Sequence, residues 1–209
     1  MRSHKTKTLQ MVRTALLSGI LCVLAPIALP VPGSPVPLSL ATFAVYLTGM
    51  LLGAKQGVLS VLVYLFLGMV GLPVFSGFSG GIGILLGPTG GYLLGYIPCV
   101  LMVGLWKDKK RNVTKLNANL TNENKKRVKC VAWDMLAMLS GTVLCYAFGT
   151  LWFVAVMDGG YTLVQALIVC VVPYFVFDAV KIMAAAALSL PLHRILRNRE
   201  TSAVYEDFL

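Results

Sequence analysis

The chain has 209 residues, of which 57% are hydrophobic and only 12% are charged, and its formal net charge is +10. Its mean hydropathy is +0.80, and a soluble domain carries about 25% charged residues, so a soluble enzyme, a disordered segment and a disulfide-stapled secreted module are excluded. The apolar runs are continuous, whereas strands of a membrane β-barrel alternate apolar and polar residues. The composition therefore predicts an all-α integral membrane protein.

Six apolar segments are predicted to cross the membrane, at about residues 12–30, 38–52, 57–71, 88–106, 131–157 and 173–195. A helix needs about 20 residues to cross the ~30 Å apolar layer, so the short second and third spans should form a tight hairpin. The prolines after the first span end it, because proline breaks a helix. Residues 162–172 are predicted to form a re-entrant or interfacial helix before Pro173, since proline is favoured at helix starts. Residues 1–209 then make one membrane domain.

The basic residues predict the orientation of these spans. All of the 18 Lys and Arg residues except Lys181 lie in the N-terminal segment, the turn between spans two and three, the loop 107–129 or the C-terminal tail. Lys and Arg concentrate in cytoplasmic loops, so both termini are predicted to be cytoplasmic, in a bacterial cell membrane. This distribution explains the net charge without a nucleic-acid partner. His and Cys show no metal-ligand spacing, so we predict neither a metal site nor a cofactor.

Two charged residues, Asp178 and Lys181, lie inside the last span. Residues three apart share one face of a helix, and a charge at membrane depth costs about 3 kcal/mol or more. The pair is either a structural ion pair that locks the helix to its neighbours or a polar site that faces a cavity. Asp134, beside the basic loop, is read as an interfacial residue.

The segment 71–87, between the third and fourth spans, is rich in glycine and carries no charge. Irregular backbone in a membrane protein survives where it lines protein or a cavity, and glycine allows the main chain to approach a ligand closely. The next helix starts near Thr89 and presents its positive end. We expect an external lid that forms part of a binding wall. The alternative is a flexible connector, but the apolar side chains of this segment argue against it.

A pair of small residues, Ala15 and Gly19, lies in the first span. Small residues spaced four apart allow close approach of helices in lipid. The pair therefore indicates packing, either against a partner protein or within the helix bundle.

Three motifs carry a family resemblance. They are Pro35-Val36-Pro37-Leu38-Ser39-Leu40, the run from Gly71-Leu72-Pro73-Val74-Phe75-Ser76-Gly77 through Gly80-Gly81 to Gly87-Pro88-Thr89-Gly90-Gly91-Tyr92, and Pro173-Tyr174 followed by Asp178 and Lys181. Over about residues 9–196 the chain resembles the BioY family, the biotin-specific substrate-binding (S) components of energy-coupling-factor (ECF) transporters. The family usually has Thr-Leu-Gln after Pro-Val-Pro, whereas this chain has Ser39-Leu40-Ala41.

The resemblance implies a high-affinity biotin binder with six helices that works with a transmembrane coupling protein and two cytoplasmic ATPase subunits. Ala15 and Gly19 would then contact the coupling protein. The expected substrate-binding residues are Thr42, Phe75, Ser76, Gly77, Phe78, Gly81, Leu85, Thr89, Tyr92, Tyr174, Asp178 and Lys181. A carboxylate only accepts hydrogen bonds and an ammonium only donates them. Asp178 therefore suits the ureido N–H groups of biotin, and Lys181 suits either the ureido oxygen or the tail carboxylate.

Two other functions are weighed against this one. An ion-coupled secondary transporter of a small carboxylate or vitamin could use Asp178 and Lys181. Such transporters often contain two related halves, and no such internal repeat is detected in this sequence. An intramembrane enzyme would need a nucleophile and a base, and no such pair is found in the sequence. We therefore predict no catalytic residues.

Overall fold

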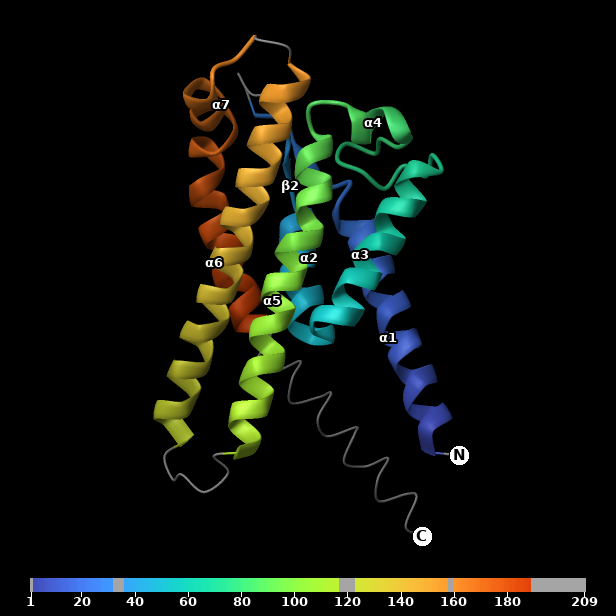
Figure 1. Cartoon of the computed structure of the whole chain (residues 1–209), viewed down its shortest axis with the longest axis vertical. Coiled ribbons are helices and arrows are strands. Elements are labelled where there is room, and N and C mark those ends of the chain that lie inside the picture. Colours follow the sequence, from blue (N-terminus) through green and yellow to red (C-terminus); the bar gives the residue numbers. More distant parts are fainter. Residues whose placement is uncertain (1, 32–35, 117–122, 158–159, 189–209) are drawn as a thin grey trace.

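The computed structural model describes residues 2–31, 36–116, 123–157 and 160–188. Helices form most of it (Figure 1). The elements in chain order are α1 (Arg2–Leu24), β1 (Ala28–Leu29), β2 (Leu38–Ser39), α2 (Ala41–Leu52), α3 (Ala54–Met69), α4 (Ile82–Leu86), α5 (Gly90–Leu116), α6 (Glu123–Val156) and α7 (Leu163–Cys170). After α7 comes a last helix, Val172–Leu188.

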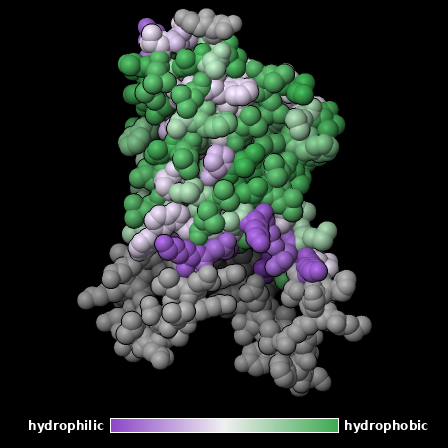
Figure 2. Space-filling view, viewed as in Figure 1, coloured by the Kyte–Doolittle hydropathy of each residue, from purple (hydrophilic) through white to green (hydrophobic). Residues whose placement is uncertain are grey.

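Among the described residues, three helical stretches are long and apolar enough to cross a membrane: Lys7–Leu24, Gly90–Lys109 and Val131–Val156. The helices α7 and Val172–Leu188 pass the same test together, with a bend of 45° between them. The helices α2 and α3 are apolar but shorter. A broad apolar belt covers the face of the molecule seen in Figure 2, and hydrophilic residues gather below it. This arrangement is that of a helical membrane protein.

The helices differ from the predicted spans mainly at their ends. The helix α1 stops at Leu24, and the following chain pairs as two short antiparallel strands, with Ala28 opposite Ser39. The helices α5 and α6 continue beyond the predicted spans into the basic loop, because Lys and Arg are good helix formers although they are not apolar. Residues 189–195 of the predicted last span lie outside the described residues.

The turn between α2 and α3 is held by the far end of α5. Lys107 donates a hydrogen bond to the carbonyl oxygen of Leu51, at the end of α2, and the Asp108 carboxylate accepts one from the amide of Ala54, at 3.2 Å, at the start of α3. A cation at a helix C-terminus and an anion at an N-terminus both complement the helix dipole. These two residues therefore fasten three helices together at the end opposite the glycine-rich segment.

The glycine-rich segment 71–87, here called the lid, is tied to the rest of the molecule. The amide of Phe75 donates to the oxygen of Ser79 at 2.9 Å, and the amide of Gly77 donates to the oxygen of Pro26 at 3.0 Å. Phe75 and Ser79 pair across a turn of three residues, 76–78, in which Gly77 and Phe78 have positive φ angles of 72° and 58°. The lid is therefore an ordered loop that backbone hydrogen bonds hold in one conformation.

Candidate functional site

A cavity of about 250 Å³ lies beneath the lid. Its walls come from the strand β2, the helices α2, α5, α6 and α7, the last helix and the lid. The lining residues are Val36, Pro37, Leu38, Ser39, Thr42, Phe75, Ser76, Ser79, Ile84, Thr89, Tyr92, Leu93, Tyr96, Cys145, Tyr146, Cys170, Tyr174, Asp178 and Lys181. Most of these side chains are apolar or aromatic, and a few polar groups converge on one side, which is the usual composition of a small-molecule site.

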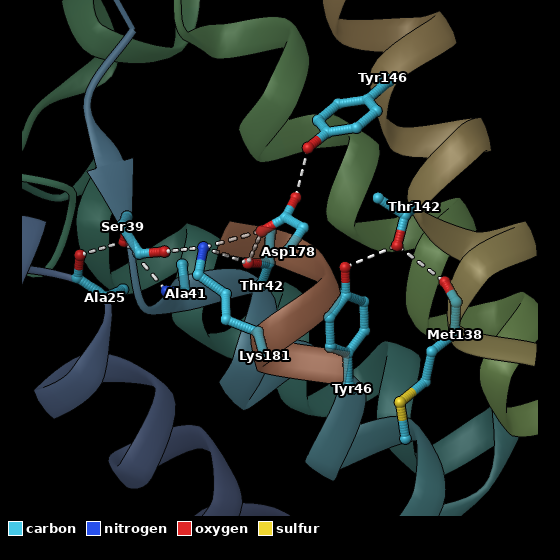
Figure 3. A network of polar contacts seen from close by, with 10 residues as sticks. All are labelled: Ala25, Ser39, Ala41, Thr42, Tyr46, Met138, Thr142, Tyr146, Asp178 and Lys181. Atoms are coloured by element: carbon cyan, nitrogen blue, oxygen red, sulfur yellow. Dashed lines mark hydrogen bonds and ion pairs between the residues drawn. The ribbon is translucent and has the colours of Figure 1, made fainter. Parts of the chain in front are cut away.

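The polar side of the cavity is organised by Lys181, whose residue is only 8% exposed. Its ammonium donates three hydrogen bonds: to the carbonyl oxygen of Ser39 at 2.7 Å, to Oγ1 of Thr42 at 3.0 Å and to Oδ1 of Asp178 at 2.9 Å (Figure 3). An ammonium has three N–H groups. All of them are therefore used by the protein.

The carboxylate of Asp178, whose residue is 4% exposed, completes this network. Its Oδ1 accepts from Lys181 and, at 3.4 Å, from the hydroxyl of Thr42, and its Oδ2 accepts from the hydroxyl of Tyr146 on α6 (Figure 3). A carboxylate has about four lone-pair sites, so Asp178 can accept a further donor. Among the described residues that line this cavity, the only formal charges are a matched pair, and the carboxylate is the member that can still bind a ligand.

Local chain geometry places Ser39 beside Lys181. The Ser39 hydroxyl donates to the oxygen of Ala25 at 2.7 Å and accepts from the amide of Ala41 at 3.0 Å. The first contact ties β2 to the end of α1, and the second ties it to the start of α2. The Ser39 carbonyl is thereby fixed as an acceptor for Lys181. Ser39 begins the Ser39-Leu40-Ala41 segment, in which this chain differs from the Thr-Leu-Gln that is usual in the BioY family.

The structure brings eight of the twelve expected binding residues to the cavity: Thr42, Phe75, Ser76, Thr89, Tyr92, Tyr174, Asp178 and Lys181. The other four, Gly77, Phe78, Gly81 and Leu85, lie outside its lining. Gly77 and Phe78 form the tip of the hairpin turn, and the Phe78 side chain is 70% exposed. Leu85 packs in the hydrophobic core, and its neighbour Ile84 lines the cavity in its place.

The sequence analysis missed Tyr146, the α6 residue that contacts Asp178. A signal was present, because Thr142 and Tyr146 are four residues apart and share one face of a mostly apolar span. The structure shows that this face points inward: Thr142 contacts the hydroxyl of Tyr46 at 2.6 Å (Figure 3). Ser39, Ser79 and Tyr96 also line the cavity without having been selected.

Ala15 and Gly19 lie on the exposed face of α1. A side-chain carbon placed on Gly19 would meet nothing within 4 Å. The inward face of the same helix instead carries Thr14 and Ser18, and Ser18 contacts the hydroxyl of Ser60 at 3.0 Å. The small-residue pair is therefore not used for packing among the described helices.

Together the fold and the cavity define a helical membrane protein with a cavity whose size and lining suit a small molecule. A family model described as the BioY family matches residues 1–198, which is nearly the whole chain. The chain belongs to the BioY family.

Named relatives agree with this assignment. The biotin transporter BioY of Thermotoga maritima is 33% identical over 187 residues, which are 89% of this chain and 96% of the relative. The biotin transporter BioY2 of Lactococcus lactis subsp. cremoris is 30% identical over 92% of this chain and 94% of the relative. A crystal structure of the S component for biotin from an ECF-type ABC transporter has a TM-score of 0.77 and 23% identity, and covers 91% of this chain and 93% of that chain. The relatives are named as transporters, and the solved structure has the same fold.

Proposed function

We propose that this protein is the biotin-binding membrane subunit of an ATP-driven vitamin importer. The observation that carries the proposal is the buried Asp178–Lys181 pair on the wall of the cavity beneath the lid. Buried charges in a membrane helix are costly, and this pair faces a space of ligand size. Biotin combines a polar ureido head, an apolar ring and chain, and a carboxylate tail, and the cavity offers a polar wall, apolar walls and hydroxyl groups.

In this proposal the ureido head of biotin lies against Asp178. One ureido N–H group donates to the remaining acceptor site of the carboxylate, which is the charged partner with acceptor capacity left. Lys181 uses its three N–H groups on Ser39, Thr42 and Asp178. The sequence left open whether Lys181 contacts the ureido oxygen or the tail carboxylate of biotin. We assign it a different role, which is to position the carboxylate of Asp178.

The carboxylate tail of biotin points toward the lid and the start of α5. Hydroxyl groups of Ser76 and Thr89 belong to the cavity wall there, and hydroxyls can donate to a carboxylate. The helix α5 begins at Gly90, directly after Thr89, and a helix N-terminus favours a negative charge. The apolar ring and chain of biotin pack between these two ends.

We further propose six membrane-spanning helices: α1, α2, α3, α5, α6 and Val172–Leu188, with α7 as the re-entrant element. The basic residues and both termini are on the cytoplasmic side of a bacterial cell membrane, as the positive-inside rule predicts, and the lid faces outward. The subunit delivers biotin through a transmembrane coupling protein and two cytoplasmic ATPases. The exposed Ala15 and Gly19 on α1 contact the coupling protein.

Retention of radiolabelled biotin by the purified chain tests the function. The expected result is saturable binding without a partner protein, ATP or an ion gradient. An ion-coupled transporter would instead bind only with its coupling ion, and an enzyme would return a changed product. Either of those results, or no saturable binding, would contradict the proposal.

A further inference from the structure

The outer surface of the lid carries an apolar patch that the binding site does not use. Phe78, Ile82 and Leu86, here called the lid patch, are 70%, 61% and 62% exposed. Ile82 and Leu86 are four residues apart on α4 and share its outer face, while Ile84 lines the cavity from the same short helix. The lid therefore has one face toward the ligand and one apolar face toward the surroundings.

Backbone geometry holds Phe78 in this exposed position. Its φ of 58° is unfavourable for a bulky residue, and such strain persists only where the surrounding structure imposes it. Here the hydroxyl of Ser79 donates to the oxygen of Ser76 at 2.9 Å, and the amide of Gly77 is bound to Pro26. These hydrogen bonds hold the turn that presents the Phe78 side chain outward.

The patch continues the lipid-facing surface of the protein. The helix α3 ends at Met69, and its outer side chains Leu62 and Phe66 are exposed. The amide of Gly81, at the start of α4, donates to the oxygen of Gly68 on α3 at 2.7 Å, so the lid lies directly on the end of this helix. The apolar surface reaches the upper end of the molecule on the side where α4 lies (Figures 1 and 2).

The absence of charged residues around the lid patch favours lipid over water as its environment. Residues 56–106, which include most of α3, the whole lid and most of α5, contain no Asp, Glu, Lys or Arg. A water-facing loop of this length with three exposed apolar side chains and no charge would be unusual for a protein surface. We propose that the lid patch inserts into the outer leaflet of the bilayer and that this contact holds the lid closed over the cavity.

The depth of the lid patch tests the first half of this proposal without any ligand. Phe78→Cys and Ile82→Cys variants are spin-labelled in lipid nanodiscs, and the accessibility of each label to oxygen and to a water-soluble nickel chelate is measured. Gly160→Cys, at an exposed position between α6 and α7, is the reference, and the parent protein measures background labelling. Both patch labels should favour oxygen and the reference should favour nickel. A patch label that favours nickel, or is shielded from both, would overturn the proposal.

The second half rests on the proposed biotin function and is tested by dissociation of radiolabelled biotin from nanodiscs. Removing an Ile side chain from an apolar environment should speed dissociation about tenfold in Ile82→Ser. Val164→Ser, which removes an exposed apolar side chain from α7 outside the lid, should leave the rate unchanged. Equal rates for Ile82→Ser and the parent would overturn the holding role. If no variant or parent binds biotin, the proposed function fails while the depth measurement still decides the lipid contact.

Discussion

Removal of either charge from the Asp178–Lys181 pair should weaken biotin binding strongly. The Lys181→Met variant loses three hydrogen bonds and leaves the carboxylate of Asp178 with only Thr42 and Tyr146 as donors. Leaving one member of a buried pair uncompensated lowers the stability of the protein by about 3–5 kcal/mol. We expect the loss of the positioned carboxylate to weaken biotin binding about 100-fold, which is about 2.7 kcal/mol. Asp178→Asn should have an effect of the same order, because it leaves Lys181 unpaired and removes the charged acceptor for the ureido group.

The double variant Asp178→Asn/Lys181→Met separates a ligand contact from a purely structural ion pair. Replacing both members of a buried pair is often neutral for stability, so the double variant should regain the thermal stability that each single variant loses. Its affinity should stay low, because the carboxylate that meets the ligand is absent. Isothermal titration with biotin and thermal unfolding measure the two quantities on the same samples.

A matched control is Ser60→Ala, which removes a buried hydroxyl that contacts Ser18 away from the cavity. It should lower stability by about 1 kcal/mol without changing affinity. If Asp178→Asn and Lys181→Met both bind biotin within about threefold of the parent, a difference below 1 kcal/mol, the pair is structural and the site assignment is refuted.

Three further variants probe separate parts of the molecule. Tyr146→Phe removes the hydroxyl that donates to Asp178 and should weaken biotin binding about tenfold, as expected for one hydrogen bond to a charged group; unchanged affinity in a titration would mean that this contact does not position the carboxylate. Asp108→Ala removes the acceptor for the Ala54 amide and should cost about 1–2 kcal/mol of stability with unchanged affinity; a large loss of affinity would show that the far end of the bundle controls the cavity. Ala15→Trp adds bulk to an exposed face of α1 and should leave biotin binding intact but abolish co-purification with the coupling protein and biotin uptake; normal co-purification would place the coupling surface elsewhere.

Sequence patterns predicted the helices better than their ends. Apolar runs locate the parts of α5 and α6 inside the membrane, but both helices continue into the basic loop, because helix formation depends on backbone hydrogen bonds and propensity and does not require apolar side chains. The pairing of β1 with β2 was not predicted, since each strand has only two residues and their partners are set by tertiary contacts.

The charged residues of the site could be predicted from the sequence, whereas the neutral residues that contact them could not. Asp178 and Lys181 stand out because a charge in an apolar span requires a reason. Tyr146 is compatible with an apolar span, so its contact with Asp178 depends on how α6 is rotated against the last helix. Phe78 belongs to the same motif as Phe75, yet only Phe75 lines the cavity, because Phe78 lies at the tip of the turn, where it is exposed.

A structure of the protein with biotin bound would test the central claim most directly. The account predicts that biotin occupies the cavity beneath the lid, with one ureido nitrogen within hydrogen-bonding distance of the Asp178 carboxylate and with Lys181 still bound to Ser39. Biotin bound elsewhere, or bound in the cavity with its ureido group away from Asp178, would contradict it.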